Sequence, residues 1–317
     1  MDTIIIGSRG SKLALTQSNW VAAQLRTANP GLEVSIVEIK TTGDRNLGAS
    51  LSELGGKGAF TKELEDALLE ERCDLAVHSM KDLPTQLPDG LGVVCTPARE
   101  DTRDVIILRE APRDANLPLG FLPHGFRIGS SSLRRRAQLH ALRPDLRVLE
   151  FRGNVDSRLR KLAEGEVDAC ILAAAGVRRL GLLHEGTMRV DGLHFRYLEA
   201  PQWLPAVGQG ALAIEGRMQN GVPTELMARL NDSATFAATV CERAFLNRLG
   251  AGCQAPVGAL ARLDPNGGIL MDVAIYSRDG ATCVRHAGTG SADRAGKLGL
   301  QLANWCLENG AQGLIAG

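Results

Sequence analysis

Aromatic residues are scarce in this sequence and make up only 4% of its 317 residues. Binding of nucleic acid by stacking of bases on aromatic rings is therefore not indicated. No apolar run is long enough to cross a membrane. The segment Met1–Gly7 has no basic part and only a three-residue apolar run, unlike a secretory signal. These absences predict a cytoplasmic protein with neither nucleic acid nor membrane as a partner.

Cysteine and histidine lack the spacings that structural bridges need. The seven cysteines are odd in number, and no two of them form a Cys-x-x-Cys pair. This argues against a disulfide framework and against a zinc ribbon. The six histidines show no spacing typical of metal ligands, so we expect no metal.

Net charge is absent as well, but the charges are unevenly distributed. Residues 127–160 hold nine arginines and only three acidic residues, a net charge of +6 in a chain whose formal net charge is +0. Arginine outnumbers lysine 29 to 7 over the whole chain, so part of this excess reflects composition. A local positive charge of this kind suits a small polyanionic ligand.

Hydrophobic periodicity predicts alternating strands and helices from the N-terminus onward. Strands are expected at Thr3–Gly7, Leu32–Lys40 and Leu75–His78. Helices are expected to begin near Ser11 and near Phe60, and the polar, glycine-rich residues 42–58 between them to form a loop. This alternation predicts a parallel α/β sheet.

The same pattern is repeated later in the chain. Ile6-Gly7-Ser8 before a helix is echoed by Ile128-Gly129-Ser130 before a helix. Residues 71–77 are echoed by residues 166–171, where a helix ends, an aspartate follows and a strand begins. The repetition predicts two similar lobes, with a ligand in the cleft between them at the carboxyl ends of the strands.

The last third of the sequence has a different pattern. A helix is expected at Ser233–Leu249, alternating strands at Val257–Leu263 and Ile269–Ser277, and a closing helix over residues 293–309. This is typical of a small α+β domain with antiparallel strands. We therefore predict three domains, namely residues 1–101 with 208–228, residues 105–204, and residues 233–317.

Asp82 is a candidate acid–base group. It lies in His78-Ser79-Met80-Lys81-Asp82-Leu83-Pro84, directly after a strand, where α/β enzymes place active groups. A carboxylate beside Lys81 can have its pKa tuned by its neighbours and can both give and take a proton. A turn aspartate or an exposed ion pair explains the spacing as well, and spacing alone favours that interpretation.

Arginine-bearing loops follow several of the predicted strands. Ser130-Ser131-Ser132-Leu133-Arg134-Arg135-Arg136 opens a helix, where free backbone N–H groups and serine hydroxyls favour anions. The segment from Arg152 to Arg158 repeats this arrangement of polar residues and arginines after the next strand, and Arg9 and Ser11 repeat it in the first lobe. Any one of these arginines could instead lie on a solvated helix face. Together they predict a pocket for several carboxylates.

Two loops carry further candidates. Gly55-Gly56-Lys57-Gly58 lacks the spacing of a nucleotide phosphate loop and could be a flexible lid. Cys253 has small neighbours and could be a nucleophile or an attachment point. The other six cysteines are interpreted as small buried apolar residues.

Seven stretches, in this order and at this spacing, resemble the hydroxymethylbilane synthase (porphobilinogen deaminase) family. They are Gly7–Ala14, Gly55–Gly58, His78–Pro84, Ser130–Arg135, Arg152–Arg158, Pro205–Ala211 and Gly252–Gln254. The family has two lobes similar to type II periplasmic binding proteins and a third domain that carries the cofactor. The resemblance implies two doubly wound α/β lobes and a small C-terminal α+β domain.

The resemblance implies a transferase of tetrapyrrole (haem) biosynthesis. Such an enzyme joins four porphobilinogen molecules head to tail into hydroxymethylbilane and releases four ammonia. The implied cofactor is a dipyrromethane held through a thioether of Cys253. The implied partners are porphobilinogen and the growing oligopyrrole, and the product passes to uroporphyrinogen-III synthase. The family is usually monomeric, so a monomer is expected here.

The resemblance also implies roles for single residues. Asp82 would assist loss of ammonia, stabilise the azafulvenium cation and help to remove the α-proton after coupling. The other implied cofactor contacts are Lys81, Ser130, Arg134, Arg135, Ser79 and Asn154. The implied substrate contacts are Arg9, Ser11, Lys57, Arg152, Arg158, Arg179 and Gln209.

Three features depart from the family pattern. Arg136 stands where the family often has glutamine, and Asp156 stands between two of the predicted binding arginines. Residues 183–200 match poorly and are interpreted as a variable surface segment.

Two other functions remain open at this point. A two-lobed anion-binding protein without catalysis would explain the repeated lobes and the arginine loops, but it gives no role to Cys253. A thiol enzyme using Cys253, His78 and Asp82 predicts a thiol that reacts freely with alkylating agents.

Overall fold

The computed structural model describes residues 3–45, 60–111, 119–184, 188–252 and 255–316. The chain divides into two compact units, residues 1–100 with 211–237 and residues 101–210 with 238–317. Each unit is therefore built from two separate stretches of the chain. The three domain boundaries drawn from the sequence stay a prediction.

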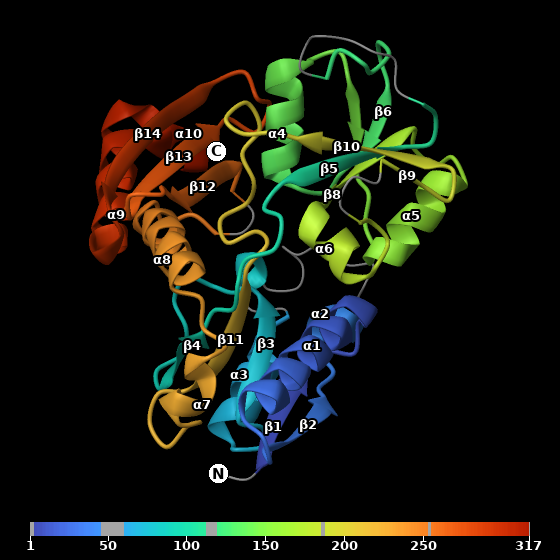
Figure 1. The fold of residues 1–317 in the computed structure, drawn as a ribbon. Coiled ribbons are helices and arrows are strands. Elements are labelled where there is room, and N and C mark those ends of the chain that lie inside the picture. The colour runs from blue at the N-terminus through green and yellow to red at the C-terminus, as the bar shows by residue number, and fades with distance from the viewer. Residues whose placement is uncertain (1–2, 46–59, 112–118, 185–187, 253–254, 317) are drawn as a thin grey trace. The chain divides into compact units, whose positions relative to one another are not determined.

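The first unit contains a five-stranded sheet in the order β2-β1-β3-β11-β4 (Figure 1). Its strands are β1 (Thr3–Ser8), β2 (Glu33–Glu38), β3 (Leu75–Ser79), β4 (Leu91–Cys95) and β11 (Leu212–Arg217). β1 is parallel to β2 and β3, whereas β11 is antiparallel to β3 and to β4. The expected parallel arrangement is confirmed for β1, β2 and β3, but the whole sheet is mixed, because β11 enters from a distant stretch of chain and runs in the opposite direction.

Helices cover both faces of this sheet. Val21 and Leu25 of α1 (Lys12–Ala28) pack with Ile4 and Ile6 on one face. On the other face, α3 (Lys62–Leu69) buries Leu64 and Leu68 against Cys73 and Ala76. The Ser11 hydroxyl accepts a hydrogen bond from the Ala14 N–H at 3.3 Å, which is why α1 begins directly after this residue. Another helix of this unit is α7 (Thr224–Ala228).

The expected loop over residues 42–58 is wrong at its start. Thr42–Arg45 form the short helix α2, and the Thr42 N–H donates to Glu63 Oε1 at 2.6 Å. This contact with α3 gives the turn a partner that the local sequence does not contain. Residues 46–58 lie outside the described residues.

The second unit contains a six-stranded sheet in the order β7-β6-β8-β5-β10-β9. Its strands are β5 (Asp104–Leu108), β6 (Arg127–Gly129), β7 (Arg147–Leu149), β8 (Ala169–Ala173), β9 (Arg189–Val190) and β10 (Leu193–Leu198). β6 is parallel to β7 and β8, while β5 is antiparallel to β8 and to β10. Three parallel strands followed by an antiparallel one are also found in the first sheet, so the predicted pair of similar lobes is confirmed.

This sheet too is buried on both faces. Val105 and Ile107 of β5 lie in one core with α5 (Val155–Ala163) and α6 (Ala174–Arg179). The alternate residues of β5 lie in a second core with α4 (Leu133–Leu142). A strand covered on both sides needs apolar residues at successive positions, which explains the run Val105-Ile106-Ile107-Leu108.

An aspartate starts the third parallel strand of each lobe in the same way. The Asp74 carboxylate accepts from the Ile5 N–H at 2.8 Å, and the Asp168 carboxylate accepts from the Arg127 N–H at 3.0 Å. Each aspartate returns its own N–H to the carbonyl of the same partner, at 2.8 and 3.0 Å. The repeated aspartates of the sequence therefore join equivalent strands of the two lobes to their neighbours through the same pair of hydrogen bonds.

The interpretation of residues 183–200 as a surface segment is right for only part of the segment. His194–Leu198 of β10 pair with β5, and Phe195 and Leu198 are buried in the second unit, whereas Met188 and Asp191 are exposed.

The C-terminal part forms a three-stranded antiparallel sheet in the order β12-β13-β14, seen with its helices in orange and red in Figure 1. Its elements are α8 (Ser233–Arg248), β12 (Val257–Leu263), β13 (Gly268–Tyr276), β14 (Cys283–Ser291), α9 (Ala295–Cys306) and α10 (Gln312–Ala316). The predicted small α+β fold is confirmed. The sequence did not predict β14, because its two glycines and few apolar residues obscure the alternation of apolar and polar positions.

Candidate active site

Two loops of the first unit lie at one edge of its sheet. Arg9 and Ser11 follow β1, and the turn Met80–Asp82 follows β3, which is parallel to β1. Gln17 of α1 donates from Nε2 to Ser79 Oγ at 3.1 Å, which joins the two loops. The structure therefore places Arg9, Ser11 and the Asp82 turn at the same edge of this sheet.

Asp82 is held on a fixed turn with its carboxylate exposed. Met80 and Leu83 on either side of it are 3% exposed, and the Met80 N–H donates to the Ala211 carbonyl at 3.0 Å. Asp82 itself is exposed, and Lys81 is half-buried. Because buried neighbours anchor the turn, it presents this carboxylate to a ligand without a large cost in ordering.

His78 faces the interior. Its Nε2 lies 2.9 Å from Glu215 Oε2, and the two side chains are 4% and 0% exposed. Glu65 of α3 is also buried, and this desolvation raises the pKa of Glu65, to which the charge of Glu215 adds. His78 is therefore part of a buried polar cluster beneath the Asp82 turn, which does not suit the exposed base of a thiol enzyme.

Arg9 lies over an aromatic ring. Its guanidinium carbon is 4.3 Å from the centre of the Phe60 ring. Such a cation–π contact keeps the planar group in place while its charge persists. Arg9 thus has the charge and the orientation needed by a carboxylate-binding residue at this edge.

Serines open helix α4 at the equivalent edge of the second lobe. Ser132 is the N-cap, and its hydroxyl accepts from the Arg135 N–H at 3.4 Å. Ser130 is buried and its Oγ accepts from the Ser132 N–H at 3.3 Å. Gly129 before them is required, since a Cβ there would lie 2.5 Å from the Phe151 ring.

Arg134 and Arg135 point inward and share one carboxylate. Arg134 Nη1 lies 2.8 Å from Asp104 Oδ2, and Arg135 Nη2 lies 2.6 Å from Asp104 Oδ1. Burial alone would raise the pKa of Asp104, but the two guanidinium charges outweigh it and hold that pKa far below its usual range. Two buried positive charges therefore stand against one negative charge.

The remaining arginines of the second lobe line the same edge. Arg158 Nε donates to the Gly153 carbonyl at 2.8 Å, Arg152 Nε donates to Glu150 at 2.5 Å, and Arg179 Nη2 donates to the Gly210 carbonyl at 2.6 Å. Desolvation lowers the pKa of Arg158 to about 10, and the charge of Arg135 adds to the shift. Asn154 occupies the N-cap position of α5 with its side chain exposed.

Gln209 joins this group from a later segment. It is 1% exposed, and its Nε2 donates to Asp104 Oδ1 at 3.0 Å and to the Thr102 carbonyl at 2.8 Å. The predicted Lys57 and Cys253 lie outside the described residues, as does the loop Gly55–Gly58. Among the residues that the structure describes, no cluster of His, Cys, Asp and Glu could hold a metal ion.

Sequence reasoning missed two buried carboxylates of the sheets, Glu215 and Asp104. Each lies on the antiparallel strand next to the third parallel strand of its sheet, and each is 0% exposed. A signal for Asp104 did exist, because an acidic residue that begins a wholly apolar strand must find a buried cation.

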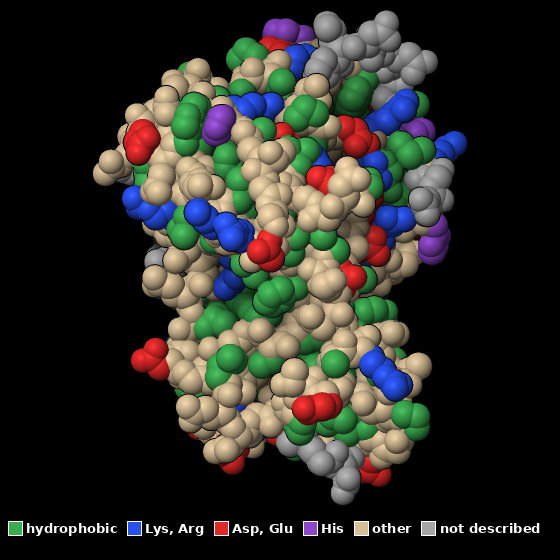
Figure 2. All heavy atoms as spheres, turned by 60° about the vertical axis from the view of Figure 1, so that its left-hand side comes forward, with side chains coloured by type: hydrophobic (Ala, Val, Ile, Leu, Met, Phe, Trp, Pro, Cys, Tyr) green, Lys and Arg blue, Asp and Glu red, His purple; other side chains and the backbone are tan. Residues whose placement is uncertain are grey.

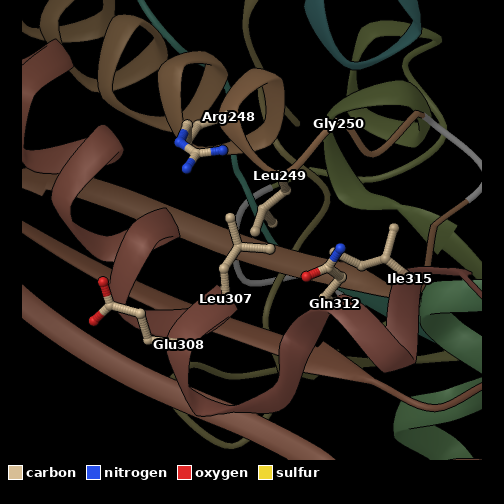
Figure 3. Close-up of a pocket in the computed structure, with 7 residues that line it drawn as sticks. All are labelled: Arg248, Leu249, Gly250, Leu307, Glu308, Gln312 and Ile315. Atoms are coloured by element: carbon tan, nitrogen blue, oxygen red, sulfur yellow. The ribbon is translucent and has the colours of Figure 1, made fainter.

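Surface charge and cavities add little to this site. On the face shown in Figure 2, basic side chains are scattered among acidic ones. A pocket of about 510 Å³ lies at the C-terminal helices, where Leu249 and Leu307 point toward each other (Figure 3). Its lining, namely Arg248, Leu249, Gly250, Leu307, Glu308, Gln312 and Ile315, includes none of the predicted site residues. In the described part of the chain, every helix is too short or too polar to cross a membrane.

Fold and site define a protein of two similar α/β lobes, with the exposed carboxylate of Asp82 after β3 in the first lobe and several arginines after the strands of the second. Residues 4–225 match the model of "Porphobilinogen deaminase, dipyromethane cofactor binding domain", and residues 236–308 match its C-terminal domain. The chain belongs to the porphobilinogen deaminase family. It is a transferase (EC 2.5.1.61) with porphobilinogen deaminase activity in tetrapyrrole biosynthesis.

Full-length relatives support this assignment. The porphobilinogen deaminase of Desulforudis audaxviator is 47% identical over 313 residues, which cover 99% of this chain and 97% of that protein. The Roseiflexus sp. enzyme is 46% identical over 315 residues, with 99% of each chain covered. An ancestral cationic amino acid solute binding protein aligns with 73% of this chain and 87% of its own, at 12% identity and a TM-score of 0.42.

Proposed function

We propose that Asp82 of the first lobe carries out the proton chemistry, and that residues of both lobes, with most of the arginines in the second, bind the carboxylates of cofactor and substrate. The observation that carries this proposal is the charge of the second lobe's site. Arg134, Arg135 and Arg158 are desolvated to different degrees, and the two most buried of them, Arg134 and Arg135, share the single carboxylate of Asp104. A buried excess of positive charge is costly unless a ligand brings negative charge.

The residues present fit a dipyrromethane. Its acetate and propionate groups are planar anions, which guanidinium forks bind in pairs. The buried Nε of Arg134 has no hydrogen-bond partner, so a donor remains for such a group. Arg134, Arg135, Ser130, Ser79, Lys81 and Asn154 would hold the cofactor, with Cys253 as its thioether attachment. When bound, the cofactor supplies the pyrrole carbon from which the chain grows.

The remaining contacts are assigned to the substrate. Arg9, Ser11, Lys57, Arg152, Arg158, Arg179 and Gln209 would bind the side-chain carboxylates of porphobilinogen and of the growing oligopyrrole. Each pyrrole added brings two carboxylates, so a chain of several pyrroles needs more cations than one molecule of substrate does.

Asp82 is the proposed catalytic residue. As the C–N bond of the substrate's aminomethyl group breaks, the amine leaves as ammonia and the pyrrole becomes an azafulvenium cation. The Asp82 carboxylate lowers the free energy of this cation by direct electrostatic attraction. After the new carbon–carbon bond has formed, the same carboxylate accepts the α-proton and the pyrrole becomes aromatic again.

We also propose that the protein is a cytoplasmic monomer and hands its product to uroporphyrinogen-III synthase. The three domains would be residues 1–101 with 208–228, residues 105–204, and residues 233–317. The assignment of these partners and boundaries is supported by family membership and by the topology of the sheets.

The test is the intact mass of the purified protein, followed by peptide mapping. The native protein should carry the mass of one dipyrromethane on the peptide that contains Cys253. Cys253→Ser should lose both this mass and activity, while Cys283→Ser, at an exposed cysteine of β14, should keep both. An unmodified Cys253 peptide in active protein would remove Cys253 from the proposal.

A further inference from the structure

One carboxylate in the second unit accepts hydrogen bonds from four residues, two on α4 and two in the segment between β10 and β11. Asp104, which is 0% exposed, accepts from Arg134 Nη1 at 2.8 Å and from Arg135 Nη2 at 2.6 Å. It also accepts from Trp203 Nε1 at 2.8 Å and from Gln209 Nε2 at 3.0 Å. These donors are up to 105 positions away from it in the sequence.

The neighbours complete the geometry of the two arginines. Arg134 Nη1 also donates to the Leu204 carbonyl at 2.7 Å, and Arg135 Nη1 donates to the Ile171 carbonyl at 2.9 Å. Both guanidinium planes are thus fixed by a carboxylate on one side and a carbonyl on the other. Without Asp104, two buried like charges would repel each other and lose the acceptor that they share.

We infer that Asp104 is a positioning residue that holds Arg134 and Arg135 in the orientation needed to bind the cofactor's carboxylates. This inference rests on the proposed role of the two arginines. It assigns to Asp104 a function beyond stability. The carboxylates of the cofactor must be bound in the correct orientation before its thioether bond can form at the right position.

The variant Asp104→Asn distinguishes a positioning role of Asp104 from a purely electrostatic one, because the two roles predict opposite changes in the binding of anionic ligands. If Asp104 only offset part of the positive charge of Arg134 and Arg135, its neutralisation would strengthen the binding of anionic ligands. If Asp104 positions the arginines, neutralisation weakens binding although the site becomes more positive. The two views therefore separate in direction as well as in size.

The measurement is the rate at which apoprotein, produced in cells that cannot make porphobilinogen, gains the cofactor mass after porphobilinogen is added. Asp104→Asn should load about 100-fold more slowly than the native chain. The matched control is Asp168→Asn, which removes an arginine-paired aspartate from the same sheet. The control should lower the melting temperature without slowing the loading. Loading of Asp104→Asn at the native rate or faster overturns the inference.

A second variant covers the case in which Asp104→Asn does not fold, as judged by near-ultraviolet circular dichroism. Asp104→Glu keeps the charge and shifts the carboxylate by one methylene. It should fold and load more slowly than the native chain but faster than any folded Asp104→Asn. Native loading by a folded Asp104→Glu whose Trp203 fluorescence has shifted also overturns the inference.

Arg135→Gln separates failure of this inference from failure of the proposed function. If folded Arg135→Gln loads at the native rate, the arginine does not grip the cofactor, and the proposed function of this residue fails. If Arg135→Gln loads slowly while Asp104→Asn loads normally, the arginine keeps its proposed role and only the positioning role of Asp104 is lost.

Discussion

The two lobes carry a buried carboxylate at equivalent places, but they partner it differently. Glu215 on β11 pairs with His78, whereas Asp104 on β5 pairs with two arginines. Histidine changes charge near neutral pH, and arginine keeps its charge at every physiological pH. In the first lobe a second carboxylate, Glu65, lies near the pair, so acid groups outnumber the base. In the second lobe the bases outnumber the acid.

This difference shows how the same sheet topology can carry two different arrangements of charge. Both sheets place three parallel strands beside an antiparallel one, and both present their loops at the carboxyl edge. The local balance of charge then decides what each edge can bind. Under the proposed function, the exposed carboxylate of Asp82 in the first lobe faces a developing cation, and the arginines of the second lobe face carboxylates.

The largest expected effect comes from the exposed carboxylate of the first lobe. Asp82→Asn should lower the turnover number by about 10²- to 10⁴-fold, because a neutral amide can neither accept the α-proton nor stabilise the cation. The measurement is the steady-state rate of product formation. Asp89→Asn, at an exposed turn of the same unit, should retain native turnover. Native turnover of Asp82→Asn would exclude the catalytic role.

The buried carboxylate of the second lobe should dominate stability. Asp104→Ala should lower the free energy of unfolding in urea by about 3–5 kcal/mol at pH 7, because it leaves two buried guanidinium groups without their shared partner. The pKa of Asp104 is depressed in the native state, so its contribution is complete above the unfolded value of about 3.9. The native chain and the variant should therefore converge as the pH falls below this value. A constant difference in acid would contradict the ion pairing.

Glu65 in the first lobe should show the opposite dependence on pH. Burial raises its pKa in the native state, so the native fold favours the protonated carboxyl. That contribution is complete below the unfolded value of about 4.3 and is lost as the pH rises through the raised pKa. Relative to the native chain, Glu65→Gln should become progressively more stable over this rise, as thermal unfolding at a series of pH values will show. An unchanged difference across the series would indicate that Glu65 ionises normally.

The smallest effect should come from a pair at the surface of the second lobe. Arg160 Nη1 lies 3.0 Å from Glu164 Oε1 on an exposed face of α5, and both side chains are at least half exposed. Glu164→Gln should change the free energy of unfolding by no more than about 0.5 kcal/mol, since solvent screens the pair. Urea unfolding beside Asp104→Ala makes the comparison direct. A loss as large as that of Asp104→Ala would mean that burial does not set the strength of these pairs.

Much of the fold could be predicted from the sequence. The periodicity of α1, α3 and α8 and the apolar strands are local properties, and the repeated Ile-Gly-Ser segments indicated the paired lobes. The sequence could not predict that β11 would join the first sheet, because that pairing closes a loop of more than a hundred residues. β14 was missed since its glycines weaken the local pattern.

The candidate site likewise has features that local sequence could predict and features that depend on long-range contacts. Local sequence indicated the chemistry of Asp82 and of the arginine loops, because residue type and position after a strand suffice for that. It placed Arg134 and Arg135 among the ligand-binding groups but did not reveal that they share Asp104.

The sequence by itself determined the alternation of helices and strands, the duplication of the lobes and the excess of arginine after the second set of strands. Only the tertiary structure decided which charges meet. His78 with Glu215, and Asp104 with its two arginines, are contacts between residues far apart in the chain. Propensity and hydrophobic period are properties of neighbouring residues, whereas the energy of a buried charge depends on partners that only folding brings within reach.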